Sequence, residues 1–409
     1  MSAEIKLGYK MTEVGVIPEE WSTAQLKDVC TLVNGRGFKP HEWKDSGLPI
    51  IRIQNLNGSG DFNYFSGRFD QKILVEGGQL LFAWSGSRGT SFGPHIWKGG
   101  KALLNYHTWK VNTNDEAVNQ SYFYYALKDL TSRIENDAHG ASALVHTQKG
   151  EMEKYYVAVP PLMHQKRVAE FLSDADTFIN CLDQLIAKKR DIKQAAMQQL
   201  LTGQKRLSGF SREWQVKRLG EIGLFMKGSG ITRDQSKSGD LPCVRYGELY
   251  TAHHDVVRKF QSFISKEVSV AATLLKQGDI LFAGSGETKE EIGKCAAFVH
   301  DIEAYAGGDI VILRPANADS TFLGYALNTQ DICRQKASRG QGDAVVHISA
   351  SALSTIEIRL PAREEQTAIA TILSDMDIEL AALEARRDKA RQLKQGMMQE
   401  LLTGRIRLV

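Results

Sequence analysis

A long segment occurs twice in this chain, once in the middle and once at the C-terminal end. Ser173-Asp174 recurs as Ser374-Asp375, and Leu200–Gly203 recurs as Leu401–Gly404, with no gap between these anchors. Each copy follows a region of short β-like runs that also repeats. Such a duplication builds approximate twofold symmetry into one polypeptide. Twofold-symmetric proteins match divided targets, above all two DNA half-sites at a fixed separation.

The region before each copy has the pattern of short strands separated by tight turns. Runs of β-branched and aromatic residues are broken by Gly, Asn and Asp, first between Trp21 and Pro161 and again between Trp214 and Pro361. Both regions contain the same anchors in the same order: LPIIRIQNL with LPCVRYGEL, GQLLFAWSG with GDILFAGSG, and ASALVH with GDAVVH. Between the anchors the sequences diverge, which is typical of one scaffold that carries two sets of surface loops.

Each β-like region is followed by a proline and a segment with apolar residues at three-four spacing. We expect two helices of about 40 residues, each about 60 Å long, ended by Gly203 and Gly404. The predicted fold class is α+β, with two β-rich domains joined by two long antiparallel coiled-coil helices and internal pseudo-twofold symmetry. The expected parts are a β-rich domain at 1–161, a helical region at 162–207, a second β-rich domain at 208–361 and a second helical region at 362–409. Because the repeat is nearly circular, we expect the two chain ends to lie close together.

Composition is that of a globular protein with two or more domains. The chain has 409 residues, of which 42% are apolar and 24% charged. No run of about 18 apolar residues occurs, and the N-terminal segment lacks the apolar core of a secretory signal, so we expect a cytoplasmic protein. The five cysteines form no CxxC pair, which fits reduced thiols and provides no zinc framework. A net charge of +3 is low for a free-standing nucleic-acid binder, so a partner is expected to supply part of any phosphate contact.

The glycine-rich and histidine-rich segments give no nucleotide or metal signature. The runs Ser85–Gly89 and Gly284–Gly286 fit neither a phosphate loop nor a dinucleotide fingerprint and are interpreted as tight turns after strands. The cluster His253-His254-Asp255 has no second cluster at ligand spacing, so we expect a solvated loop and no metal site.

The carboxylates of the repeated helix resemble an acid–base pair only superficially. Asp174 and Asp176 recur as Asp375 and Asp377, near the start of each helix, where acidic side chains favour the helix dipole. Capping or contact with a partner therefore explains them better. Neither an HExxH nor a GxSxG motif occurs. We expect no catalytic residue in this chain.

Polar and basic residues lie on turns at matching places in both β-like regions. Arg suits guanine edges, Asn and Gln suit adenine, and Asp or Glu can accept a hydrogen bond from cytosine. One such residue is more simply an ordinary loop residue, but a paired set on divergent loops favours DNA recognition. In the first region the candidates are Arg36, Lys39, Arg52, Gln54, Asn55, Trp84, Ser85, Ser87, Arg88, Asn105, His107, Ser142 and His146. In the second region they are Arg233, Arg245, Tyr246, Glu248, Ser285, Glu287, Lys289, Arg339, Gln341, Asp343 and His347.

Together these features resemble the specificity (S) subunits of type I restriction-modification enzymes. The resemblance rests on the W…L start of each region, LPIIRIQNLNGSG, GGQLLFAWSGSRGT, GASALVH and GDAVVH, the proline-led helix with LSDAD or LSDMD, and LLTG. It covers essentially the whole chain. It implies a non-catalytic DNA-specificity subunit in which each of two target-recognition domains reads one half of a bipartite asymmetric site.

The resemblance also implies partners. Two methyltransferase subunits, which bind S-adenosylmethionine, would dock on helices that set the gap between the half-sites. Two motor-nuclease (restriction/translocase) subunits would use ATP and magnesium, and this chain would bind no cofactor itself. A four-residue insertion after Gly203 that extends the helix would add about 6 Å, or roughly two base pairs of gap. The alternative is a coiled-coil adaptor that pairs two β-domains for protein–protein interaction without binding DNA.

Overall fold

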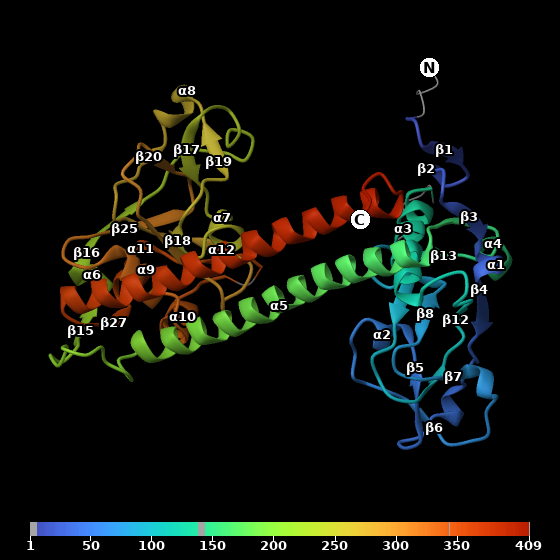
Figure 1. The fold of residues 1–409 in the computed structure, drawn as a ribbon. Coiled ribbons are helices and arrows are strands. Elements are labelled where there is room, and N and C mark those ends of the chain that lie inside the picture. The colour runs from blue at the N-terminus through green and yellow to red at the C-terminus, as the bar shows by residue number, and fades with distance from the viewer. Residues whose placement is uncertain (1–5, 138–143, 343, 409) are drawn as a thin grey trace. The chain divides into compact units, whose positions relative to one another are not determined.

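The computed structural model describes residues 6–137, 144–342 and 344–408. By their contacts, the residues divide into two compact units. Unit 1 comprises Met1–Asp183 with Ala385–Val409, and unit 2 comprises Gln184–Glu384. Each unit combines a β-rich region with part of the two long helices, α5 (Leu162–Leu200) and α12 (Arg363–Leu402) (Figure 1). The boundary between the two units therefore falls within both long helices, at equivalent positions of the two sequence copies. The four-part division at residues 161, 207 and 361 follows the sequence copies and stays a prediction.

Two four-stranded sheets form the β-rich region of unit 1. The first is antiparallel and has the order β10-β8-β12-β4. The second has the order β6-β5-β11-β7, with β5 and β11 parallel. Their strands are β4 (Cys30–Asn34), β5 (Leu48–Ile51), β6 (Tyr64–Phe65), β7 (Leu74–Val75), β8 (Leu80–Ala83), β10 (Gly93–Ile96), β11 (Ala102–Leu104) and β12 (Thr108–Thr113).

Unit 2 repeats this topology strand for strand. Its first sheet has the order β16-β25-β21-β23-β18 and its second the order β19-β17-β24-β20, with β17 and β24 again parallel. The strands are β16 (Gly223–Lys227), β17 (Leu241–Val244), β18 (Asp255–Val257), β19 (Ser262–Ile264), β20 (Thr273–Leu274), β21 (Ile280–Ala283), β23 (Cys295–Phe298), β24 (Tyr305–Ala306) and β25 (Ile310–Pro315). Strand β18 is the addition to the unit 1 pattern.

Smaller elements complete both units. Two-stranded ribbons are β1 (Tyr9–Thr12) with β2 (Gly15–Pro18), β3 (Ser22–Gln25) with β14 (Tyr156–Val159), β9 (Ser85–Ser87) with β13 (Leu144–His146), β15 (Gln215–Arg218) with β27 (Glu357–Leu360), and β22 (Ser285–Gly286) with β26 (Val346–His347). The helices of unit 1 are α1 (Leu26–Val29), α2 (Ile53–Leu56), α3 (Gln120–Asp137), α4 (Lys149–Met152) and the 3₁₀ turns η1 (Pro40–Glu42) and η2 (Gln71–Ile73). Those of unit 2 are α6 (Leu219–Ile222), α7 (Glu248–Thr251), α8 (Lys266–Ser269), α9 (Ser320–Ala326), α10 (Gln330–Ala337) and α11 (Ala350–Ser354).

The central strand of each unit is buried on both faces. In β8, Phe82 packs in one cluster with Phe123 of α3, while Leu81 packs on the other face with Leu103 of the second sheet. Because neither face meets solvent, the strand is a continuous apolar run rather than an alternating one. The same holds for β21, whose four residues are all buried.

The two long helices run antiparallel within each unit, as predicted. In unit 1, Leu172 near the start of α5 packs with Leu401 at the end of α12. In unit 2, Leu200 at the end of α5 packs with Leu373 near the start of α12. The expected α+β class, with two β-rich regions and two long helices, is confirmed.

The segments near the two chain ends meet in unit 1. Tyr9 Oη donates a hydrogen bond to Gly404 O at 3.1 Å, and Arg407 forms an ion pair with Glu20 at 3.3 Å. The nearly circular repeat explains this contact, since the equivalent Gly203 of unit 2 lies against Trp214, the counterpart of Trp21.

Both helix-ending glycines adopt the left-handed conformation, with φ +73° at Gly203 and +70° at Gly404. We predict that Gly203→Ala lowers the free energy of unfolding by about 1–2 kcal/mol, because an L side chain is strained there. Gly404→Ala should lower the free energy of unfolding further, because the alanine Cβ would lie 2.5 Å from Pro18 Cδ. Urea unfolding measures both.

The matched control is Gly396→Ala. This glycine is exposed within α12 and an added Cβ meets nothing within 4 Å, so the variant should gain about 0.5–1 kcal/mol. If Gly203→Ala and Gly404→Ala lowered the free energy of unfolding equally, the steric conflict with Pro18 would not explain the cost at Gly404.

Candidate nucleic-acid interface

Five segments of unit 1 meet at one edge of its sheets, where strands β4, β5, β8, β11 and β13 end. We call them the edge loops of unit 1: residues 35–36, 51–52, 84–85, 105–107 and 146–147. Backbone hydrogen bonds connect them: Arg36 N to Leu104 O at 2.9 Å, Asn105 N to Ile51 O at 3.2 Å, Trp84 N to His107 O at 3.2 Å, and Thr147 N to Trp84 O at 3.0 Å.

Unit 2 has the same edge. Its edge loops, residues 228–230, 244–245, 284–285, 307–309 and 347–348, follow the equivalent strands. The connecting bonds are Gly308 N to Gly230 O at 3.0 Å, Gly307 N to Val244 O at 2.9 Å, Gly284 N to Asp309 O at 2.7 Å, and Ile348 N to Gly284 O at 2.9 Å. Three of these bonds, those donated by Gly307, Gly284 and Ile348, are the counterparts of bonds in unit 1, while the bond between the first and fourth loops has a different donor and acceptor in each unit.

Glycines permit this close backbone approach. A Cβ on Gly35 would lie 2.0 Å from Asn105 O, and a Cβ on Gly228 would lie 2.1 Å from Gly307 O. Any other residue would push the loops apart. The sequence contained this signal in the matching NGRG and KGSG segments, which the sequence analysis did not weigh as a pair.

The side chains on the two edges differ. Unit 1 carries a cluster of tilted aromatic rings, in which the ring centroids of Tyr106 and His107 are 3.7 Å apart and those of Trp84 and His107 are 5.3 Å apart. Trp84 Nε1 donates to Tyr106 O at 2.8 Å, and Tyr106 is 47% exposed. At the corresponding places unit 2 has Gly284, Gly308 and Asp309. Sequence reasoning missed both Tyr106 and Asp309, because neither lies in a repeated anchor.

Two polar atoms of the unit 1 edge are buried without a hydrogen-bond partner among the described residues. They are Asn105 Oδ1 and His107 Nδ1. Burial lowers the pKa of His107, so its imidazole is neutral near pH 7. Buried polar atoms normally have a partner, so a water or a ligand atom at this edge would satisfy them.

The short ribbons place a Ser–His pair at the same register of each unit. Ser85 pairs with His146 in β9–β13, and Ser285 pairs with His347 in β22–β26. Both histidines are exposed, and Ser285 Oγ lies 2.9 Å from His347 Nδ1. Gln341 joins this ribbon through backbone hydrogen bonds with His347.

Several candidates use their polar groups within their own unit. Arg36 pairs with Glu42 and stacks on Phe38, while Arg52 Nη1 donates to Asn63 Oδ1 at 2.9 Å. The Arg339 guanidinium donates to Thr355 Oγ1 at 2.8 Å. These arginines therefore shape the loops, and their hydrogen-bonding capacity is partly occupied.

Asn55 and Glu248 perform the same structural task at equivalent positions. Asn55 Oδ1 accepts from Arg52 N, and Glu248 Oε2 accepts from Arg245 N, each at 3.0 Å. Burial raises the pKa of Glu248, but the neighbouring His253 imidazole and hydrogen bonds from the Ser262 hydroxyl and this backbone amide outweigh burial and hold the pKa below its usual range. Both side chains therefore cap a turn.

The remaining candidates divide by exposure. Tyr246 and the Arg245 side chain are half-buried at the unit 2 edge. Exposed side chains are those of Lys39, Gln54, Ser87, Arg88, Arg233, Glu287, Lys289 and Gln341. Ser142 and Asp343 lie outside the described residues.

Two expectations need correction. His253-His254-Asp255 is not a solvated loop, because His253 is 1% exposed and Asp255 begins strand β18. Asp176 and Asp377 do not cap their helices; each binds a tyrosine and a lysine of its own unit. Within the described ranges, no group of three or more metal-binding side chains occurs. No helix there is long and apolar enough to cross a membrane.

The chain matches a known protein family over most of its length. Residues 18–190 and 211–392 match the family model of the type I restriction modification DNA specificity domain. The chain is 24% identical over 418 residues to the type I restriction enzyme MjaVIII specificity subunit of Methanocaldococcus jannaschii, covering 96% of this chain and 94% of the relative.

Two solved structures are similar in fold. The type I restriction-modification system S subunit from M. genitalium matches with a TM-score of 0.61 and 16% identity, covering 93% of this chain and 96% of that one. A chain from a structural study of complex assembly and conformational transition of the type I R-M system matches with a TM-score of 0.55 and 13% identity, covering 95% of this chain and 99% of that one.

The turn-capping role of Asn55 can be tested against its neighbour. Asn55→Ala removes the hydrogen bonds to Arg52 N, Ser59 O and Asp61 O and should lower the free energy of unfolding by about 1–3 kcal/mol. Gln54→Ala, at an exposed side chain, should change it by less than about 0.5 kcal/mol. Urea unfolding compares the two variants. An Asn55→Ala protein of unchanged stability would contradict the capping role.

Proposed function

Because this chain belongs to the type I restriction modification DNA specificity domain family, we propose that it selects the DNA site for a type I restriction-modification complex. Each unit reads one half of a bipartite asymmetric site. One observation carries this proposal: three backbone hydrogen bonds between the edge loops recur in both units, whereas the side chains at Trp84, Tyr106 and His107 are replaced by Gly284, Gly308 and Asp309. A shared scaffold with two chemistries suits two half-sites of unlike sequence.

The two edges offer different hydrogen bonds to DNA. Unit 1 presents the exposed Tyr106 ring beside a neutral His107. Unit 2 presents Arg245 and Asp309, and Arg suits guanine while Asp can accept a hydrogen bond from cytosine N4. We therefore expect the half-site read by unit 2 to contain at least one G·C pair.

The long helices are the proposed docking surfaces for methyltransferase subunits. Large apolar side chains of α5 recur at seven-residue spacing and remain about two-fifths exposed: Phe171 39%, Phe178 42%, Leu185 39% and Ile192 44%. A stripe of this kind suits a partner helix. Two methyltransferase and two motor-nuclease subunits would form the complete cytoplasmic complex, and these partners would hold S-adenosylmethionine, ATP and magnesium.

Methylome sequencing of a host that expresses this chain with its methyltransferase partner tests the proposal. We expect a split motif, and we expect His146→Ala and His347→Ala each to relax one half of it only. Loss of a base contact costs about 1–3 kcal/mol of discrimination. Each variant is the control for the other, because the two histidines occupy the same register in different units.

Two results would contradict the proposal. A continuous motif, or one altered in both halves by either variant, would overturn the assignment of one half-site to each unit. A purified complex that shifts no duplex at low salt would favour the coiled-coil adaptor, since phosphate contacts are strongest there.

The spacer role of the helices has its own test. We predict that seven residues of helix inserted after Asp183 and again after Glu384 widen the gap by about three base pairs. Seven residues add about 10 Å, and base pairs are about 3.4 Å apart. Nearly two complete turns also keep the helix faces aligned. Methylome sequencing gives the new gap, and an unchanged gap would contradict a spacer role.

A four-residue insertion after Gly203 becomes the control for this experiment. Helix α5 ends at Leu200, and Gly203 lies in the left-handed turn beyond it. Such an insertion lengthens the connection to β15 rather than the helix. We therefore expect it to leave the gap unchanged, which differs from the expectation drawn from the sequence, where the insertion was taken to extend the helix.

A further inference from the structure

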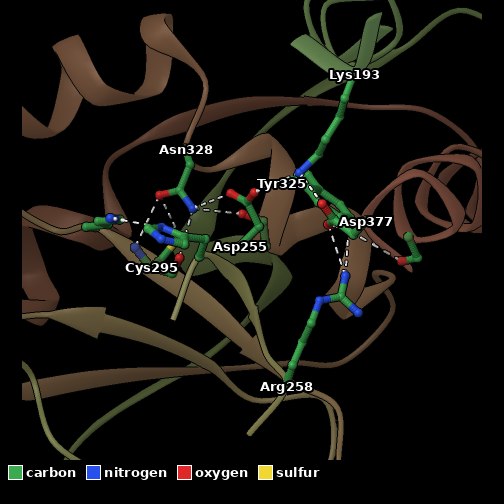
Figure 2. Close-up of polar contacts among 11 residues, drawn as sticks. Lys193, Asp255, Arg258, Cys295, Tyr325, Asn328 and Asp377 are labelled. Atoms are coloured by element: carbon green, nitrogen blue, oxygen red, sulfur yellow. Dashed lines mark hydrogen bonds and ion pairs between the residues drawn. The ribbon is translucent and has the colours of Figure 1, made fainter. Parts of the chain in front are cut away.

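A tyrosine, an aspartate and a lysine from three helices meet in unit 2. Tyr325 Oη of α9 donates to Asp377 Oδ2 of α12 at 2.6 Å. Lys193 Nζ of α5 donates to Asp377 Oδ1, also at 2.6 Å, and lies 5.3 Å from the centroid of the Tyr325 ring. Figure 2 shows Asp377 with Tyr325 and Lys193 directed at it.

Unit 1 contains the same cluster with the two long helices exchanged. Tyr125 Oη of α3 donates to Asp176 Oδ2 of α5 at 2.9 Å. Lys394 Nζ of α12 donates to the other oxygen of Asp176 and lies 5.6 Å from the Tyr125 ring centroid. Since the loops of the two units have diverged, the survival of this arrangement in both copies indicates a shared role.

Each cluster lies where the β-rich region joins the helices of its unit. In unit 1, Tyr125 belongs to the same apolar cluster as Leu172 of α5 and Leu401 of α12. The lysine side chains are only 13% exposed at Lys394 and 16% at Lys193. Burial raises the pKa of both tyrosines, as do the neighbouring carboxylates, so both phenols stay protonated and donate.

We propose that Tyr125–Asp176–Lys394 and Tyr325–Asp377–Lys193 are positioning clusters that hold each β-rich region at one orientation on the helices of its own unit. This inference rests on the proposed function, because a fixed orientation matters most when two half-sites must be met at one separation. The clusters act through the edge loops and contact no DNA themselves. A carboxylate with donors on both oxygens accepts one geometry, whereas apolar packing allows small rotations.

The two clusters differ in the number of cations that bind the aspartate. In unit 2, Arg258 Nη2 also donates to Asp377 Oδ2 at 3.0 Å and to Tyr325 Oη at 3.3 Å (Figure 2). In the described part of unit 1, Lys394 is the one cation bonded to Asp176. Removing the lysine therefore leaves Asp377 still paired with Arg258 but leaves Asp176, which is partly buried, without a cation, so the change should cost more in unit 1.

The test uses the full chain assembled with its methyltransferase partner. The probes are duplexes that carry the methylated motif with its natural gap, or with the gap shortened or lengthened by one base pair. The measured quantity is the ratio of affinities for the natural and altered gaps. We expect Lys394→Met to reduce this ratio by about tenfold, Lys193→Met to reduce it less, and Tyr125→Phe to reduce it while the ring stays in place.

Matched controls separate positioning from stability. Lys101→Met removes the cation of an exposed ion pair with Glu76, and Arg334→Met removes the cation of an exposed ion pair with Asp331. Exposed pairs contribute little, so both controls should keep the wild-type ratio. Thermal unfolding and assembly with the methyltransferase show whether each variant is folded.

The outcomes distinguish the two proposals. The positioning role is supported if the wild-type complex discriminates between the gaps and the folded Lys394→Met complex does not. If the variants bind every duplex more weakly but keep the wild-type ratio, the clusters serve stability and the positioning role is overturned. If the wild-type complex binds all three duplexes equally, the bipartite reading itself fails, and the positioning role fails with it.

Discussion

The burial of the central strands β8 and β21 on both faces is the constraint on which each unit depends. Every residue of LLFA and of ILFA is buried, so each strand needs a helix on one side and a second sheet on the other. With both faces covered, the chain can vary only where the strands end. The edge loops gather there because the parallel pairs β5–β11 and β17–β24 end at this side, and the antiparallel strands β12 and β25 begin where β8 and β21 end.

This arrangement explains how one fold can carry two chemistries. Trp84 and Gly284 each follow directly after the central strand of their unit; Trp84 is half-buried against the unit 1 core, and Gly284 is buried. A Cβ on Gly284 would lie 2.8 Å from Asp309 O, so unit 2 brings two loop backbones together at the place where unit 1 has the Trp84 ring. The close approach of the loop backbones requires glycine at Gly35 in unit 1 and at Gly228 and Gly284 in unit 2. Two half-sites of different sequence can thus be read without a change in scaffold.

Elements and their symmetric pairing could be predicted from the sequence, whereas individual side-chain contacts between distant residues could not. The repeat, the buried strands and the two long helices follow from spacing patterns within a few residues. The positioning clusters do not, since Lys394 and Asp176 are 218 positions apart. Asn55 and Glu248 looked like DNA contacts because polarity alone does not reveal that a turn already uses the side chain. Strand β18 was missed because unit 1 has no counterpart to predict it from.

The chemistry of the positioning clusters supports an orienting role over a purely stabilising one. Replacing a buried ion pair with apolar side chains of similar volume is often neutral or stabilising, so stability alone gives no reason to keep one. Here a partly buried carboxylate with a lysine and a tyrosine occurs at the junction of both units, and each tyrosine belongs to a cluster that is otherwise apolar. What such a group adds is a single hydrogen-bonding geometry. That property is required of a junction that must aim a set of loops in one direction.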